Sequence, residues 1–209
     1  MRSRLFWGNR HDPLGGFPKE LWETMRPRWK QVHGVGVVEV SVPGQECGEV
    51  DGLWTRSPDL PIGVVTADCV PILLEHAQGT ARAALHAGWR GIFARIPEAF
   101  FEALPSELAN PRDWSAVLGP SIRACCYEVS PELVDSFCRE LSGLPRSRIE
   151  PTHRRLDLIS VLQHQFGVLG VPELEVSGEC THCATSEGQG KYLSYRRGDR
   201  HSRQLSIIL

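Results

Sequence analysis

Three segments of the sequence place reactive side chains beside glycines or between apolar runs. They are QVHG (31–34), TADC (66–69) and HAGWRG (86–91). The side chains of His33, Cys69 and His86 form a donor set that favours zinc, and three protein ligands leave the fourth position open for water or substrate. An open position is typical of a catalytic metal site. Because no two of these residues lie close in sequence, their spacing is equally compatible with three ordinary core residues.

Asp68 and Arg90 lie next to these candidate ligands. The Asp68 carboxylate would act as a general base or orient a ligand histidine. Arg90 follows a Gly-Trp pair at the expected start of a helix, where phosphate binding is favoured, and a structural ion pair is the close alternative. The same residues also allow a metal-free interpretation, in which Cys69 is the nucleophile and His86 the base of a hydrolase. In that case Asp68 or a backbone carbonyl would orient His86.

Four further cysteines occur as two short pairs. Cys125 and Cys126 are adjacent, so we expect their side chains to diverge and to pack beside Tyr127 rather than share a metal. Cys180 and Cys183 form a single C-x-x-C motif, and without a second such pair a zinc site is not expected there. Redox activity would require a helix directly after the motif, and the glycines that follow argue against one.

The elements that must position these side chains are short strands and a few helices. Apolar runs predict strands over 36–42, 62–66, 70–74, 81–86, 114–118, 174–176, 192–195 and 204–209. Helices are expected over 91–104, from Ser130 with Pro131 in its first turn, and over 156–169 with Gly170 as its end. Residues 8–30 are expected to form loops and one short helix. This order is not a regular βαβ alternation, and we expect an α+β fold with mixed sheets in a single domain, 1–209.

Composition and charge narrow the class of protein. Apolar residues make up 41% of the chain and charged residues 23%, and the formal net charge is −2. These values are ordinary for a globular protein and indicate neither a nucleic-acid nor a membrane partner. No segment resembles a signal peptide or a bilayer span, so we expect a cytoplasmic protein. Seven cysteines are too few and too irregular for a disulfide scaffold.

From Gln31 to Leu209 the sequence resembles the YfiH-type family, also called laccase-domain or "polyphenol oxidase" proteins. The matching motifs are QVHG, DGLWT (51–55), TADCVPILL (66–74), HAGWRG, GPSIRACCYEV (119–129), LDL (156–158) and CTHC…YLSYRRGD (180–199). The resemblance implies a layered α/β/β/α sandwich and one zinc per chain, bound by His33, Cys69 and His86. Two regions depart from the family pattern. Residues 1–30 are short and divergent, and His201-Ser202-Arg203 stands where the family has Thr-Gly-Arg.

The resemblance further implies activity on purine nucleosides. The implied reactions are phosphorolysis of adenosine, inosine, guanosine and methylthioadenosine, and hydrolytic deamination of adenosine. Zinc with an open position fits deamination, because it lowers the pKa of a bound water that attacks C6 of adenine, and Asp68 would take and return the proton. For phosphorolysis we expect phosphate between the zinc and Arg90. The protein is expected to act as a monomer or homodimer.

Two other functions, a multi-copper oxidase and a non-catalytic binding domain, fit the sequence less well. A multi-copper oxidase needs about ten histidine ligands, largely in His-x-His pairs, whereas this chain has eight histidines and no such pair. A single copper ion in the zinc site is therefore the only copper chemistry left, and it is less favoured than zinc. A non-catalytic, zinc-stabilised binding domain would require a fourth protein ligand, and the sequence offers no obvious one.

Overall fold

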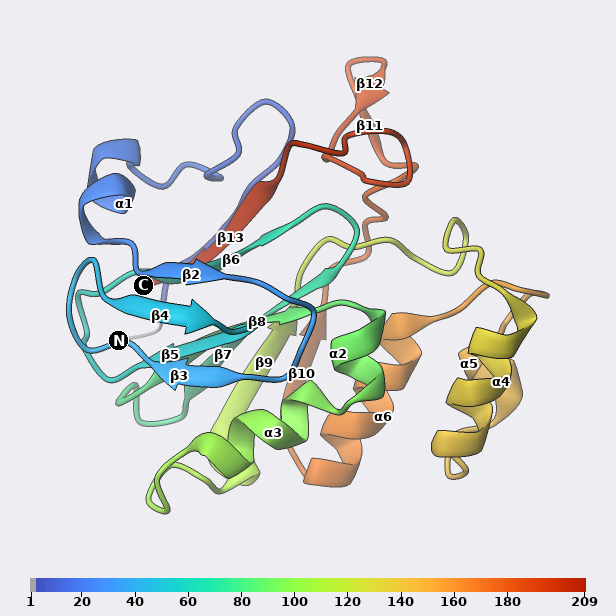
Figure 1. Ribbon diagram of the computed structural model, residues 1–209, viewed down its shortest axis with the longest axis horizontal. Coiled ribbons are helices and arrows are strands. Elements are labelled where there is room, and N and C mark those ends of the chain that lie inside the picture. Colours follow the sequence, from blue (N-terminus) through green and yellow to red (C-terminus); the bar gives the residue numbers. More distant parts are fainter. Residues whose placement is uncertain (1–2) are drawn as a thin grey trace.

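The computed structural model describes residues 3–209 and is built around a mixed sheet of six strands (Figure 1). Its order is β10 (Glu173–Val176), β9 (Trp114–Leu118), β7 (Val70–His76), β8 (Arg82–Ala87), β5 (Gly52–Thr55) and β3 (Val37–Glu39). The four central strands pair antiparallel, and the two edge strands pair parallel with their neighbours. The predicted mixed α+β architecture is confirmed.

A second, antiparallel sheet consists of β1 (Leu5–Trp7), β13 (Gln204–Ile208) and β6 (Ile62–Thr66). It packs against the six-stranded sheet through a core that contains Val64, Ile208 and Leu73. On its outer side, Ile207 contacts a cluster with Trp22 of α1 (Lys19–Met25). Because successive strand residues point to opposite faces, Ile207 and Ile208 serve two different cores.

Helices cover the other face of the six-stranded sheet (Figure 1). They are α2 (Trp89–Phe93), α3 (Ile96–Ala103) and α6 (Leu158–Leu169), while α4 (Pro131–Glu140) and α5 (Arg146–Ile149) lie to the side, with α5 against α6. In β7, Ile72 and Leu74 face this helical core while Leu73 faces the second sheet. Burial on both faces explains why the strand is an unbroken apolar run. The layers are thus helices, sheet, sheet and α1, as in the expected sandwich.

Four short strands complete the fold and lie outside these two sheets. β2 (Arg28–Lys30) pairs with β4 (Glu46–Glu49), and β11 (Thr185–Ser186) pairs with β12 (Gln189–Gly190). A short 3₁₀ helix, Pro111–Asp113, precedes β9.

The predicted helix signals act as expected at two helices. At the start of α4 the Ser130 side chain accepts a hydrogen bond from the Leu133 N–H, and Pro131 occupies the first turn. At the start of α6 the Asp157 carboxylate accepts hydrogen bonds from two backbone N–H groups, and Gly170 ends the helix with φ 85°. The helix begins two residues later than predicted.

Three predictions of secondary structure were wrong. Residues 8–30 were expected to form loops and one short helix, but they also contain the strand β2. The expected helix over 91–104 is two helices, because Arg95 between α2 and α3 is left-handed with φ 61°. The expected strand over 192–195 is an irregular turn. There the Leu193 and Ser194 N–H groups donate to the side chains of Gln204 and Asp199 instead of a neighbouring strand. Side-chain acceptors satisfy the backbone donors that a sheet would otherwise satisfy.

Candidate functional site

Segments far apart in sequence meet at one end of the two sheets and bring His33, Cys69 and His86 together. His33 follows β2, Cys69 directly precedes β7, and His86 lies within β8. Their potential ligand atoms all lie within 4.8 Å of one another. His86 is buried, Cys69 is half-buried and His33 is exposed, so the group opens outward from the sheet. The two imidazole rings meet edge to face, with centroids 4.8 Å apart.

A buried carboxylate, Asp51, fixes both histidines. The register of β5 and β8 places Asp51 opposite His86. Its carboxylate lies 2.7 Å from His86 Nδ1 and accepts hydrogen bonds from the backbone N–H groups of Val32, His33 and Gly34. These three N–H groups form an anion-binding nest, which stabilises the left-handed φ of 61° at His33. Because Asp51 occupies Nδ1, the Nε2 atom of His86 is the one left for a ligand.

Asp51 is the first residue of the DGLWT motif, and no role for it was predicted from the sequence. It is fully buried, and burial opposes its ionisation, but the hydrogen bonds from His86, Gly34 and Val32 keep its pKa below the ordinary value. The sequence signal for such a role was an aspartate placed directly before an apolar strand that is expected to be buried. An ionised carboxylate is seldom buried without a cationic or N–H partner.

Asp68, the residue singled out as a base or orienting group, has other partners. One of its carboxylate oxygens accepts a hydrogen bond from the Thr181 hydroxyl at 2.7 Å, and the other accepts one from the Arg196 N–H at 2.8 Å. The carboxylate that contacts His86 is Asp51 rather than Asp68. Asp68 has φ 89° at the turn between β6 and β7 and attaches the C-terminal segment to this turn.

Cys69 and His86 shift each other's protonation. Burial raises the pKa of Cys69, but the contacts with His33 and His86 outweigh it and lower the pKa to about 6. Burial lowers the pKa of His86, but Asp51 and Cys69 outweigh it and raise the pKa to about 9. Without a metal, the sulfur is therefore a thiolate at neutral pH, which is the form that binds metals and attacks electrophiles.

The structure also explains why two other positions of the motifs are occupied by Gly88 and Gln31. A Cβ at residue 88 would lie 2.9 Å from a ring carbon of His33 and 3.1 Å from Cys69 Sγ. Only glycine leaves room for both side chains there. The amide of Gln31 pairs with both the N–H and the carbonyl of Val65, at 2.8 Å each. It thereby ties the loop that carries His33 to β6.

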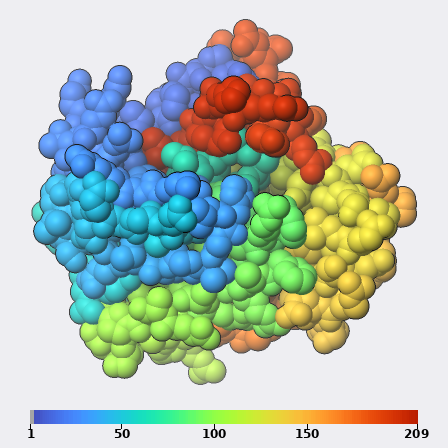
Figure 2. Space-filling view, in the orientation of Figure 1, coloured from blue at the N-terminus to red at the C-terminus, as the bar shows by residue number. Residues whose placement is uncertain are grey.

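The three-residue group lies in the wall of a cavity of about 550 Å³, the size of a small-molecule site. In the space-filling view, the C-terminal segment (red) lies over the teal and green residues beside this region (Figure 2). Trp89, Tyr127 and Tyr195 contribute aromatic surface to the wall. Burial raises the pKa of Tyr127 to about 12, so its hydroxyl stays protonated.

Three arginines, Arg90, Arg196 and Arg203, also line the cavity. Within residues 3–209, none of the three forms a salt bridge with a carboxylate. Arg90 lies over the Trp89 ring at 4.8 Å, and Arg196 lies over the Tyr127 ring at 5.0 Å. Because Asp68 is the only carboxylate among the lining residues, this side of the cavity is suited to an anion.

Arg197, the neighbour of Arg196, does not line the cavity. Its guanidinium donates to the backbone carbonyls of Thr181 and His182. The segment that carries both arginines is a turn.

The remaining cysteines are arranged differently from the prediction. Cys125 and Cys126 were expected to diverge, and Cys180 with Cys183 was expected to lack a second pair. Instead the four sulfur atoms all lie within 4.8 Å of one another. The adjacent cysteines lie in a tight turn, where the Cys126 and Tyr127 N–H groups both donate to the Arg123 carbonyl. This curvature allows neighbouring side chains to point to the same side.

Comparison with known proteins places the chain in a family. Residues 20–209 match the family model described as "Multi-copper polyphenol oxidoreductase laccase". The chain is 34% identical over 188 residues to "Purine nucleoside phosphorylase PA4543" of Pseudomonas aeruginosa, which covers 88% of this chain and 74% of that protein. It is 29% identical over 185 residues to "Purine nucleoside phosphorylase YfiH" of Escherichia coli, with 88% and 73% covered.

Solved structures agree with this result. The chain resembles protein NMB0706 of Neisseria meningitidis with a TM-score of 0.75 and 26% identity, over 88% of this chain and 74% of that one. It resembles YlmD of Geobacillus stearothermophilus with a TM-score of 0.72 and 30% identity, over 87% and 73%. Among the described residues, no helix has the length and apolar character needed to cross a membrane. The chain belongs to the laccase-domain family of the YfiH proteins.

Proposed function

We propose that the chain is a zinc-dependent purine nucleoside phosphorylase that also deaminates adenosine. The observation that carries the proposal is the convergence of His33, Cys69 and His86 on one wall of a cavity whose other side chains include three arginines that have no carboxylate partner within residues 3–209. Two relatives that bear the name purine nucleoside phosphorylase support the substrate class.

The three side chains fit a zinc ion. They supply two imidazoles and a thiol with a lowered pKa, and within residues 3–209 their group contains no fourth ligand. Zinc bound there would supply Lewis acidity and positive charge at an open coordination position. Asp51 would hold His86 with Nε2 turned toward the ion, as carboxylates commonly do for zinc-bound histidines. This arrangement favours a catalytic ion over the non-catalytic, zinc-stabilised domain.

The family description names copper, but this chain does not fit a multi-copper centre. The sequence has eight histidines, and the metal-binding groups among residues 3–209 contain only two of them. Blue-copper and trinuclear centres together need about ten histidine ligands. A single copper ion would use the same three donors, but no methionine among residues 3–209 lines this cavity to supply the axial ligand typical of a blue-copper site, and zinc is therefore favoured.

Phosphorolysis requires phosphate beside C1′ of the ribose while the purine leaves. Arg90, at the first turn of α2, would hold the phosphate through charge-assisted hydrogen bonds. Arg196 and Arg203 would add positive charge around it. The rings of Trp89, Tyr127 and Tyr195 would accept the purine by stacking.

Deamination requires a proton acceptor near the attacking water. Asp68 lines the cavity and is 7% exposed, and each of its oxygens already accepts one hydrogen bond. A carboxylate oxygen has a second lone-pair site, so Asp68 can still accept a proton. We therefore retain Asp68 as the proposed base, positioned by Thr181 and the Arg196 backbone.

The test is phosphate-dependent release of ribose 1-phosphate from inosine by wild-type protein and by Cys69→Ala, with zinc counted per chain. We expect the activity of the variant to fall roughly 1,000-fold, because a bound metal would supply several kcal/mol of transition-state stabilisation. Cys47→Ala removes a thiol outside the group and is the matched control. Equal turnover by Cys69→Ala and wild type would show that the zinc mechanism is wrong.

A second candidate function is a Cys–His hydrolase, and the pKa of Cys69 near 6 favours it. In this mechanism the Cys69 thiolate attacks, and His86, oriented by Asp51, transfers the proton. Bound zinc would suppress such a nucleophile. Protein in which His33, Cys69 and His86 hold zinc, so that Cys69 resists alkylation, supports the first function; protein in which this group is free of metal and Cys69 is alkylated supports the second.

A further inference from the structure

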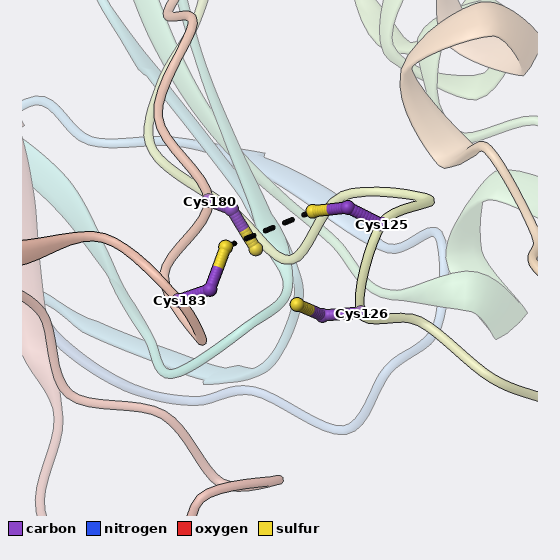
Figure 3. Close-up of side chains that lie close together, drawn as sticks. All are labelled: Cys125, Cys126, Cys180 and Cys183. Atoms are coloured by element: carbon purple, nitrogen blue, oxygen red, sulfur yellow. Dashed lines mark hydrogen bonds between the residues drawn. The ribbon is translucent and has the colours of Figure 1, made fainter.

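A second group of metal-binding character lies outside the cavity, in two turns that are distant in sequence. Cys125 and Cys126 lie between β9 and α4, and Cys180 and Cys183 lie between β10 and β11. Figure 3 shows the four side chains turned toward a common centre. Their sulfur atoms are all within 4.8 Å of one another.

Backbone contacts hold the two turns together. Ser121 and Cys180 form a parallel bridge, in which the Thr181 N–H donates to the Ser121 carbonyl at 3.0 Å. The Arg123 N–H points at the Cys180 sulfur, 3.4 Å away. The convergence of the four thiols therefore follows from main-chain pairing and not from the positions of flexible side chains alone.

The distance between two of the sulfur atoms fits a metal site. Cys125 Sγ and Cys183 Sγ are 3.8 Å apart, whereas disulfide sulfurs are about 2.05 Å apart. In a tetrahedral site with zinc–sulfur bonds of about 2.3 Å, neighbouring sulfurs are about 3.8 Å apart. The observed distance is thus the edge of a ZnS₄ tetrahedron, and the other pairs need to close by about 1 Å at most.

We propose that Cys125, Cys126, Cys180 and Cys183 bind a second, structural zinc ion, separate from the three-residue group. Four thiolate ligands complete the coordination of zinc and leave no position for substrate, which is the pattern of structural sites. The half-buried Arg123 guanidinium, which donates to the Ser177 carbonyl, feels the charges of Cys125 and Cys180 and would offset part of the negative charge.

The second ion would brace one wall of the cavity. The first turn leads directly into Tyr127, and the second turn includes Thr181, whose hydroxyl donates to Asp68. The segment after Cys183 contains only the two-residue strands β11 and β12 before β13. A metal cross-link at its start would restrain this segment, because zinc binding contributes directly to folding free energy.

The test counts metals in variants that separate the two groups. Protein would be produced with zinc under reducing conditions as Cys69→Ala, and as Cys69→Ala with Cys125→Ala and Cys183→Ala, the two exposed members of the cluster. We expect one zinc per chain in the single variant and none in the triple variant. Cys69→Ala with Cys47→Ala and Cys138→Ala is the control and should keep its zinc.

Cobalt provides a readout that does not depend on activity. Co(II) in Cys69→Ala should give the intense thiolate-to-metal charge-transfer absorption of a four-sulfur site. The variant that also carries Cys125→Ala and Cys183→Ala should lose this absorption. The proposal is overturned if Cys69→Ala holds no zinc and no Co(II), or if its intact mass shows disulfides among the four residues. It is also overturned if the triple variant, folded by circular dichroism, keeps its metal. Each result is independent of whether zinc bound by His33, Cys69 and His86 catalyses phosphorolysis.

Discussion

The molecule contains two clusters of metal-binding side chains, and they are built in contrasting ways. The first, His33, Cys69 and His86, is formed at strand ends and is oriented by the buried carboxylate of Asp51. The second consists of four cysteines in two turns that are joined by main-chain contacts. The first lines a cavity of about 550 Å³, and no member of the second does. Three donors beside a cavity suit a reactive ion, whereas four donors without one suit a structural ion.

The two clusters also differ in the protonation of their side chains when no metal is bound. In the first cluster, opposite charges on Cys69, His86 and Asp51 favour the ionised form of each. In the second, burial and the thiols of Cys180 and Cys183 raise the pKa of Cys125 to about 11. The first cluster is therefore ionised without a metal. The second contains thiols of raised and of lowered pKa, because hydrogen bonds from the backbone N–H groups of Arg123, Cys183 and His182 outweigh burial and lower the pKa of Cys180.

Replacing the orienting carboxylate should produce the largest difference between the clusters. Asp51→Asn keeps the shape of the side chain but removes the charge and places an NH₂ group among backbone donors. We expect metal affinity at the first cluster and phosphorolysis to fall on the order of 100-fold, as for other second-layer carboxylates. Metal titration and initial rates measure both, with exposed Asp135→Asn as control. Unchanged rates would show that Asp51 does not position His86 for catalysis.

Alkylation of the metal-free protein at pH 7 compares the two clusters directly. With pKa values of about 6 and about 11, the thiolate fraction of Cys69 exceeds that of Cys125 on the order of 10⁴-fold. Lower intrinsic nucleophilicity of the more acidic thiol reduces this to roughly 50-fold in rate. Mass spectrometry after brief iodoacetamide treatment should find Cys69 modified first, although Cys125 is more exposed. The Cys69 rate should fall as the pH drops below about 6, where its thiolate is protonated. Earlier modification of Cys125 would contradict the contrast.

A side chain at residue 88 would crowd the first cluster and not the second. In Gly88→Ala the new Cβ would press on His33 and Cys69, while φ of −76° is open to alanine. We expect kcat/KM to fall roughly ten- to a hundredfold through displaced ligands, with little change in Tm. Gly167→Ala in α6, where a Cβ meets nothing within 4 Å, is the control and should stabilise the protein by about 0.5–1 kcal/mol. A normal rate with Gly88→Ala would mean that the ligand positions tolerate displacement.

The smallest effect is expected at the anion side of the cavity. Arg90→Gln removes one charge that has no carboxylate partner within residues 3–209. Loss of one charge-assisted contact should raise the KM for phosphate about tenfold and leave both metal counts unchanged. Rates at varied phosphate, with Arg112→Gln outside this cavity as control, measure it. An unaltered KM would indicate that Arg196 or Arg203, and not Arg90, binds the phosphate.

Local sequence determined much of what this protein contains. The caps of α4 and α6, the apolar strands and the three motifs with His33, Cys69 and His86 all follow from residue type and short-range order. These signals act over a few residues, where propensity, capping and side-chain alternation dominate. They predicted the α+β class and the candidate donor residues, whereas the layered sandwich and the complete ligand set were implied by the family resemblance.

Tertiary structure decided which side chains share a site. Asp51 and not Asp68 contacts His86 because the register of β5 and β8 places Asp51 opposite it, and register is a non-local property. The four cysteines meet because the Ser121–Cys180 bridge joins two turns that lie at least 54 residues apart in the chain, the separation of Cys126 and Cys180. No local spacing encodes that meeting. The sequence determined the reactive groups, and the strand pairings determined their neighbours, which set their charge and their chemistry.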